Sequence, residues 1–477
     1  MMLLACLFLP VIGGVLVVLT SRWPNIRETV SILTGIALFA LVLQLPTALP
    51  VTVLAEPAPG FQLALHIEPL GYVFACLASF LWIVTTVYAI GYMRGHHEQN
   101  QTRFYFWFAV AIAATMGVAF SGDMLTLFVF YEILTLATWP LVTHSQTKEA
   151  RRSGRIYLGI LLSTSMGLLL LSIGLIWWLT GSLEFRPGGV FDGTVAAPVL
   201  AIIYALFVFG VGKAALMPFH GWLPAAMVAP TPVSALLHAV AVVKAGVFTI
   251  IKGTFYLFGL DNLSVSGANE YLLPVAVITI ILASLIAMQQ DNLKARLAYS
   301  TVSQLSYVVL GALLANVIGV IAAAVHLVMH AFAKITLFFC AGAIMVASHK
   351  TEISDMRGLG RRMPYTMGAF IIGALGIIGL PPLGAIWSKW YLTLGVIENQ
   401  YWSIIGVIVV STLLNIAYLL PIPIRGFMDG DEQEGSRGIS EAPLACLLAI
   451  GITSVGCVAL FFYAPQLVEF LAGGFKR

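Results

Sequence analysis

The sequence predicts an all-α polytopic membrane protein with about fourteen transmembrane helices, which include two inverted five-helix repeats containing broken helices. Hydrophobic residues make up 60% of the chain and charged residues only 9%, whereas soluble proteins are about 25% charged. Apolar stretches of 18 or more residues recur along the chain, each long enough to cross a hydrocarbon core about 30 Å thick. These observations exclude a soluble protein.

The predicted spans begin at the N-terminus. The first lacks a preceding basic stretch, so it is predicted to be a membrane helix and not a cleaved signal peptide. The fourteen spans are predicted at residues 2–20, 28–48, 69–93, 104–121, 123–143, 155–180, 197–217, 232–257, 271–290, 294–314, 317–347, 364–396, 402–425 and 443–465.

The basic residues of the loops are distributed unequally between the two sides of the membrane. With the first loop on the cytoplasmic side, sixteen of the 24 lysines and arginines fall on that side. Four fall on the opposite side, at Arg186, Lys252, Lys476 and Arg477. Because cytoplasmic loops are enriched in basic residues, we expect a multi-pass protein of the cell inner (plasma) membrane with both termini outside the cytoplasm.

Glycine and proline interrupt two spans that lie five spans apart. The seventh span contains FGVGKAALMP, and the twelfth is broken at Pro381–Pro382. Interrupted segments at corresponding positions indicate repeats that hold a binding site, and units of five spans must be inverted relative to each other. The predicted divisions are three N-terminal helices, a first repeat, a second repeat, and an acidic loop with a final helix, at 1–103, 104–257, 258–425 and 426–477.

Four lysines lie within predicted spans, at Lys213, Lys244, Lys334 and Lys389. A lysine at this depth costs a few kcal/mol, so it indicates a functional site. A desolvated lysine can also release its proton, which arginine cannot. These residues are therefore candidate proton relay groups, although snorkelling or a static ion pair would also account for a single one.

Glu132 is the single acidic residue that the sequence places deep in a span. A carboxylate at this depth requires a cation or a proton, so we expect Glu132 to pair with Lys213. A purely structural ion pair is the alternative.

His326, His330 and Lys334 share one face of the eleventh span, because they are four residues apart. Bridged by water, three such groups would conduct protons; two hydrogen-bonded core histidines are the alternative. His220 and His238 are secondary candidates. The HLVMH sequence lacks the acid of a zincin motif, and no metal, nucleotide or haem signature is present. We therefore expect no metal and no cofactor. The five cysteines lack CxxC spacing and are expected in the core.

Four sequence motifs resemble one family. They are LMPFHGWLPAAMVAPTPVSALLHAVAVVKAG, DNLKARLAYSTVSQLSYVVLG, HAFAKITLFFCAG and GLPPLGAIWSKW. They are similar to the antiporter-like membrane subunits shared by respiratory complex I, membrane-bound hydrogenases and Mrp-type multisubunit cation/proton antiporters. The resemblance covers roughly residues 70–420 and implies fourteen helices with inverted repeats.

The resemblance also implies roles for the buried residues. Glu132 and Lys213 would be a coupled pair, Lys244 a central relay and Lys389 a terminal group, with the histidine stripe between them. The resemblance is strongest to the Mrp D subunit, because Lys389 replaces a glutamate of some complex I subunits.

Two assemblies are compatible with these features: a sodium/proton antiporter, and a complex I-type NADH:quinone oxidoreductase or membrane-bound hydrogenase. In either, this chain is a proton transport subunit without redox chemistry of its own. Its expected partners are other membrane subunits, the lipid bilayer, protons and, in an antiporter, sodium ions; no nucleic acid is expected.

Overall fold

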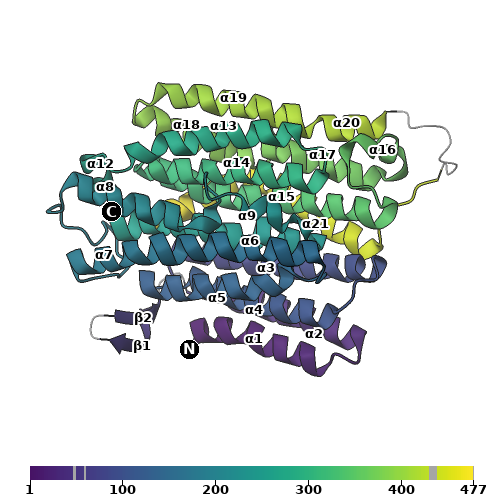
Figure 1. Cartoon of the computed structure of the whole chain (residues 1–477), viewed down its shortest axis with the longest axis horizontal. Helices are drawn as coiled ribbons and strands as arrows, with labels where there is room; N and C mark the ends of the chain where they lie inside the picture. Colours follow the sequence, from purple (N-terminus) through teal and green to yellow (C-terminus); the bar gives the residue numbers. More distant parts are fainter. Residues whose placement is uncertain (47–49, 59–60, 429–437, 476–477) are drawn as a thin grey trace.

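A computed structural model describes the chain except residues 47–49, 59–60, 429–437 and 476–477, and except the side chains of residues 57–58 and 237–238. Residues 429–437 contain most of the predicted acidic loop, which therefore lies outside the described part. The chain is a polytopic helical membrane protein whose long helices run side by side (Figure 1).

Among its described residues, the N-terminal half contains twelve α-helices and a β-hairpin. Its elements are α1 (Met2–Leu19), α2 (Pro24–Leu43), β1 (Thr52–Ala58), β2 (Phe61–Leu65), α3 (Pro69–Gly95), α4 (Gln101–Ala119), α5 (Met124–Val142), α6 (Lys148–Thr164), α7 (Leu170–Thr180), α8 (Ala197–Gly210), α9 (Trp222–Ala225), α10 (Thr231–Ala235), α11 (Val242–Lys252) and α12 (Leu260–Ser266).

The C-terminal half is wholly helical within the described residues. Its helices are α13 (Leu273–Gln289), α14 (Leu293–Leu313), α15 (Val317–Ser348), α16 (Leu359–Arg362), α17 (Pro364–Ile378), α18 (Ala385–Glu398), α19 (Trp402–Leu419), α20 (Pro421–Phe427) and α21 (Leu444–Gly474). The last helix, α21, returns across the bundle to pack against α3 and α15.

Among the described residues, ten helices are long and apolar enough to cross a membrane, or eleven if the bent pair Val242–Phe258 and Leu260–Ser266 is one span. Each predicted span nevertheless coincides with a helix or with a broken pair of helices. The pieces of the broken spans are shorter than the helices counted here: α8 has 14 residues and α17 has 15. The count of fourteen spans and the division into repeats remain predictions.

The β-hairpin is an element that the sequence did not predict. Strand β2 extends the pairing onto the turn between α4 and α5, where the His66 amide donates to Phe120 O at 2.7 Å and Gly122 donates to Ala64 O at 2.7 Å. Asp123 caps α5 by accepting a hydrogen bond from the Thr126 amide at 2.7 Å, as expected of a capping residue. The hairpin therefore covers one end of the first helices.

Both chain ends lie at one end of the helical bundle (Figure 1). The end of α21 is held there because the Tyr256 hydroxyl donates to Gly474 O at 3.0 Å. At the other end, Arg94 from α3 forms an ion pair with Glu28 of α2 at 2.5 Å, and Arg27 lies 3.3 Å from the same carboxylate. Arginines that the sequence assigns to the cytoplasmic loops thus gather together.

The seventh span breaks as predicted. Helix α8 ends at Gly210, and a short 3-10 turn, Gly212–Ala214, follows. The Trp222 indole donates to Gly212 O at 3.0 Å, so a carbonyl at the break has a partner.

Helix α11 packs directly against this turn. A Cβ atom on Gly246 would lie 2.5 Å from the carbonyl carbon of Lys213. Only glycine permits this approach of two backbones. The packing brings the element that carries Lys213 against the helix that carries Lys244.

The twelfth span also breaks as predicted. Helix α17 ends at Ile378, Gly379 has a φ of 85°, and α18 begins at Ala385. The positive φ explains why glycine ends α17. The break leaves the Ile378 carbonyl available to a side chain.

Lys252 is buried in an ion pair that the sequence did not predict. Its side chain is 1% exposed and its Nζ lies 2.7 Å from the Glu68 carboxylate, while its expected place on the outer side of the membrane stays a prediction. Lys252 also donates to Ser121 O at 2.6 Å. The pair joins the C-terminal end of α11 to the N-terminal end of α3, and Glu68 is a buried acid that the sequence did not indicate.

We predict that Lys252→Met destabilises the chain far more than the double substitution Lys252→Met/Glu68→Met. The single change leaves a buried carboxylate without its cation, which costs about 3–5 kcal/mol, whereas replacing both charges is close to neutral. The thermal midpoint of the purified protein measures both effects, with the exposed Lys148→Met as control. Equal midpoints for the single and double variants would contradict the ion pair.

Candidate functional site

The buried lysines and histidines lie on elements that pack together in the bundle interior. Lys213 sits on the broken turn after α8, Lys244 on α11 and Lys389 on α18. His326, His330 and Lys334 all lie on α15. The six side chains are between 0% and 8% exposed.

Lys213 is held by α5. Its Nζ donates to Tyr131 O at 2.8 Å and to Thr135 Oγ1 at 2.5 Å. It also lies 3.1 Å from the centre of the Tyr131 ring, a cation–π contact. The ammonium is thus bound by neutral groups.

The predicted ion pair between Glu132 and Lys213 is not formed. No nitrogen–oxygen distance within 4.0 Å joins the two side chains, although they are close enough to interact electrostatically. Both Glu132 carboxylate oxygens are buried and make no hydrogen bond. On α5, Glu132 lies between Tyr131 and Thr135, the two residues that bind Lys213.

Lys244 contacts a second titratable side chain. Its Nζ lies 2.6 Å from Nδ1 of His330. The ammonium can donate to the lone pair of neutral imidazole, or a neutral amine can accept from Nδ1–H. A single proton can therefore sit on either partner while the hydrogen bond is kept, which is the geometry of a proton transfer step.

The histidine stripe runs as predicted along one face of α15. The rings of His326 and His330 stack with their centres 5.9 Å apart, and Tyr307 of α14 stacks on the other side of His326 at 5.7 Å. His326 Nδ1 lies 2.8 Å from Ser388 Oγ on α18. The stripe thereby connects α11 to the residue that precedes Lys389.

Lys389 occupies the second helix break. Its Nζ donates to the freed Ile378 carbonyl at 2.7 Å and to Thr412 Oγ1 of α19 at 3.2 Å. A freed carbonyl beside Lys389 was expected from the Pro381–Pro382 break. As for Lys213, its partners are neutral oxygens.

Lys334 points away from the two histidines toward α14. It donates to Ser300 Oγ at 2.8 Å and to Leu297 O at 3.3 Å. The equal spacing along α15 therefore does not make His326, His330 and Lys334 one hydrogen-bonded row. Lys334 forms a separate branch.

Of the secondary candidates, His220 does not join this group. His220 is partly exposed and its ring lies 6.2 Å from that of Tyr299. His238 lies in the helical turn Leu236–Val240, and its side chain is outside the described part of the structure.

Neutral hydroxyl partners were missed by the sequence reasoning. Thr135, Ser300, Ser388 and Thr412 each hydrogen-bond a candidate lysine or histidine. Serine and threonine are common in membrane helices and usually bond their own backbone, so the sequence does not mark them out. For Ser388 the one available signal is its place beside Lys389.

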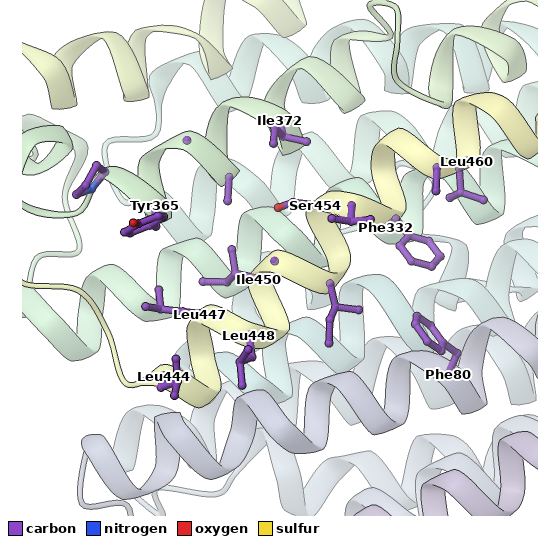
Figure 2. A pocket seen from close by; sticks show the side chains of 18 of the residues that line it. Phe80, Phe332, Tyr365, Ile372, Leu444, Leu447, Leu448, Ile450, Ser454 and Leu460 are labelled. Carbon is purple, nitrogen blue, oxygen red and sulfur yellow. The ribbon is translucent and has the colours of Figure 1, made fainter.

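A large cavity lies elsewhere. It is a groove of about 1200 Å³ between α17 and α21, with Phe80 and Phe332 toward one end and Tyr365 toward the other (Figure 2). Its lining is apolar apart from Ser454 and Tyr hydroxyls, and it includes no candidate relay residue. Within the described ranges, no group of three or more His, Cys, Asp or Glu side chains could hold a metal ion.

Residues 121–415 match the family model described as NADH:quinone oxidoreductase/Mrp antiporter, transmembrane. NADH-quinone oxidoreductase subunit N of Desulforudis audaxviator is 33% identical over 86% of this chain and 84% of its own length. The chloroplast NAD(P)H-quinone oxidoreductase subunit 5 of Ipomoea purpurea is 31% identical over 68% of this chain, which covers only 46% of that protein. The chain thus spans about half the length of such subunit 5 relatives.

Two solved structures share the fold. A chain of an archaeal membrane-bound sulfane sulfur reductase, a respiratory membrane complex, superposes with a TM-score of 0.86 at 21% identity, over 99% of this chain and 97% of the other. A chain of the Mrp complex from a Dietzia species superposes with a TM-score of 0.81 at 22% identity, over 99% and 96%. At these identities, the likeness shows the fold alone.

We predict that His326→Ala retains more proton movement than Lys334→Ala. Water can take the place of an imidazole between Ser388 and His330, whereas loss of Lys334 removes a charge and one of the donors to Ser300 Oγ. Proton uptake by vesicles that contain the assembled complex measures the difference. Complete inactivation by both substitutions, with assembly intact, would indicate a rigid structural cluster instead.

Proposed function

Because the chain belongs to the NADH:quinone oxidoreductase/Mrp antiporter family of membrane subunits, we propose that it translocates protons through the interior of its helical bundle. It does so as one subunit of a multisubunit complex in the cell inner (plasma) membrane, with both termini outside the cytoplasm. The relay consists of Glu132, Lys213, Lys244, the histidine stripe with Lys334, and Lys389.

The 2.6 Å contact between Lys244 and His330 carries this proposal. It joins the half of the bundle that contains Lys213 to the half that contains Lys389. Both partners exchange protons within an accessible range when they are desolvated. A contact made only for stability would be better served by a fixed charge pair or by two neutral groups.

Glu132 sets the state of Lys213 in this proposal. In the present geometry the carboxylate is near Lys213 but not bonded to it. At about 4 Å and an effective dielectric near 20, an ion pair is worth about 4 kcal/mol before desolvation. Moving Glu132 toward Lys213 therefore favours the ammonium, and moving it away favours release of a proton toward Lys244.

The path continues through His330 and His326. Their rings are stacked and not hydrogen-bonded to each other, so water is required between them. From His326 the proton reaches Lys389 past Ser388. The Ile378 carbonyl and Thr412 then hold the ammonium until it leaves.

For the parent complex we propose an Mrp-type cation/proton antiporter, in which sodium exchanges for protons. Lys389 supports it, because an antiporter-like D subunit carries lysine where some complex I subunits carry glutamate. A complex I-type oxidoreductase is the second candidate, supported by the long match to a subunit N. Mass spectrometry of the chains that co-purify distinguishes them: small membrane subunits without cofactors support the first, and soluble subunits with flavin or iron–sulfur centres the second.

We predict that Glu132→Ala and Lys213→Ala each abolish proton translocation while the complex still assembles. Each change removes one half of the switch that sets the protonation of the relay. Proton movement into vesicles is the measurement, and Lys148→Ala, at an exposed position, is the control. Near-normal translocation by either assembled variant would rule out its role.

We predict that Lys389→Arg fails nearly as badly as Lys389→Ala. Arginine keeps the charge and can still donate to Ile378 O, but it cannot release its proton. The two rates of proton translocation are compared at equal assembly. If the arginine variant works like the unaltered protein, Lys389 is a fixed charge and the proton leaves by another group.

A further inference from the structure

A row of uncharged polar side chains on α14 faces the interior of the bundle. Ser300, Gln304 and Tyr307 are spaced four and three residues apart, so they lie on one face of the helix. Each is at most 1% exposed. In an apolar bundle such a row needs polar partners.

Helix α19 presents a matching row. Ser411, Asn415 and Tyr418 repeat at the same kind of spacing and are all fully buried, and Thr412 lies beside Ser411. The Tyr418 hydroxyl lies 3.0 Å from Ser300 Oγ and 2.5 Å from Asn415 Oδ1. The Tyr307 hydroxyl faces Ser411 and Thr412 from α14. We call these two facing rows the α14–α19 seam.

The seam ends on two of the candidate relay lysines. At one end, Lys334 donates to Ser300 Oγ at 2.8 Å. At the other, Lys389 donates to Thr412 Oγ1 at 3.2 Å. Tyr418 and Thr412 are six residues apart, about 9 Å along α19. The seam therefore joins Lys334 to Lys389 without using His326 or His330.

Three polar atoms of the seam make no hydrogen bond to the protein, although they are buried. They are Gln304 Oε1, Gln304 Nε2 and Asn415 Nδ2. Buried polar groups are nearly always hydrogen-bonded, to protein or to ordered water. Unpaired donors and acceptors this close together are the surroundings in which buried water is stable.

We propose that the α14–α19 seam binds a file of water molecules and conducts protons between Lys334 and Lys389, in parallel with the histidine stripe. This inference rests on the proposed function, and it gives Lys334 a role that its separation from the histidines otherwise leaves without explanation.

The transfer balances along the seam. Lys334 gives one proton to Ser300 Oγ, and Ser300 passes its own hydroxyl proton to the Tyr418 oxygen. Tyr418 passes its hydroxyl proton to water beside Asn415, whose amide orients the water but does not titrate. Water beside Ser411 and Thr412 delivers a proton to neutral Lys389 Nζ. Lys334 loses one proton, Lys389 gains one, and every hydroxyl and water ends with its original number.

The test is a double-mutant cycle in the assembled complex, reconstituted into vesicles. Tyr418→Phe removes one hydroxyl of the seam, and His326→Ala interrupts the stripe. Tyr204→Phe is the matched control, because Tyr204 is another fully buried tyrosine, bonded to Thr254 at 2.8 Å far from the seam. Proton movement is driven by a sodium gradient or by NADH with a quinone, according to the partner chains.

If the two routes work in parallel, each single substitution should slow proton movement by about 2-fold. The double variant should be slower by at least about 20-fold, well beyond the product of the two single slowing factors. Adding Tyr204→Phe to His326→Ala should not slow proton movement further. Thermal midpoints of the two Tyr→Phe variants should match, which separates conduction from a loss of stability.

Two results would overturn the seam. One is a double variant no slower than the product of its singles, and the other is inactivation by Tyr418→Phe alone with assembly intact. Failure of the proposed function would look different, because Lys213→Ala would then translocate protons normally. If Lys213→Ala is inactive and the double variant is slowed only by the product of its single variants, then the seam does not conduct protons but the main relay does.

Discussion

A buried ammonium must have hydrogen-bond acceptors, and this requirement governs the interior of the bundle. Lys213, Lys252, Lys334 and Lys389 meet it in one way: each donates to a backbone carbonyl, at Tyr131, Ser121, Leu297 and Ile378 respectively. A carbonyl accepts a proton in a hydrogen bond but does not take it over. Lys213, Lys334 and Lys389 are thus held in place by groups that do not compete for the proton, whereas Lys252 is also paired with the Glu68 carboxylate. Lys244 differs, because its bonded partner is the imidazole of His330.

This difference divides the lysines by role. Where the acceptor is a carbonyl, the lysine stays protonated, and release of its proton depends on a change in nearby charge or water. Where the acceptor is imidazole, the proton can sit on either of the two nitrogens that share the hydrogen bond. The broken helices contribute to the first arrangement, since the end of α17 supplies the Ile378 carbonyl to Lys389.

The fold and much of the candidate site could be predicted from the sequence. The positions of Lys213 and Lys389 at helix breaks followed from glycine and proline, and the stripe on α15 followed from helical spacing. The contact between Lys244 and His330 could not be predicted, because it depends on how α11 and α15 pack. The ion pair of Lys252 could not be predicted, because its partner, Glu68, is 184 residues away in the chain and lies at the start of a different helix. Spacing along one helix also suggested that Lys334 continues the stripe, whereas its long side chain turns to Ser300.

The contact of Gly246 with the turn at Lys213 limits the kinds of motion that can drive the relay. With no side chain between the two backbones, α11 has no room to slide or tilt against the turn unless the two move together. The backbones beneath Lys213 and Lys244 thus behave as one rigid frame. Gating between these two lysines must come from rotation of flexible side chains and from the arrival or departure of water, which are fast, small movements, and not from rocking of whole helices.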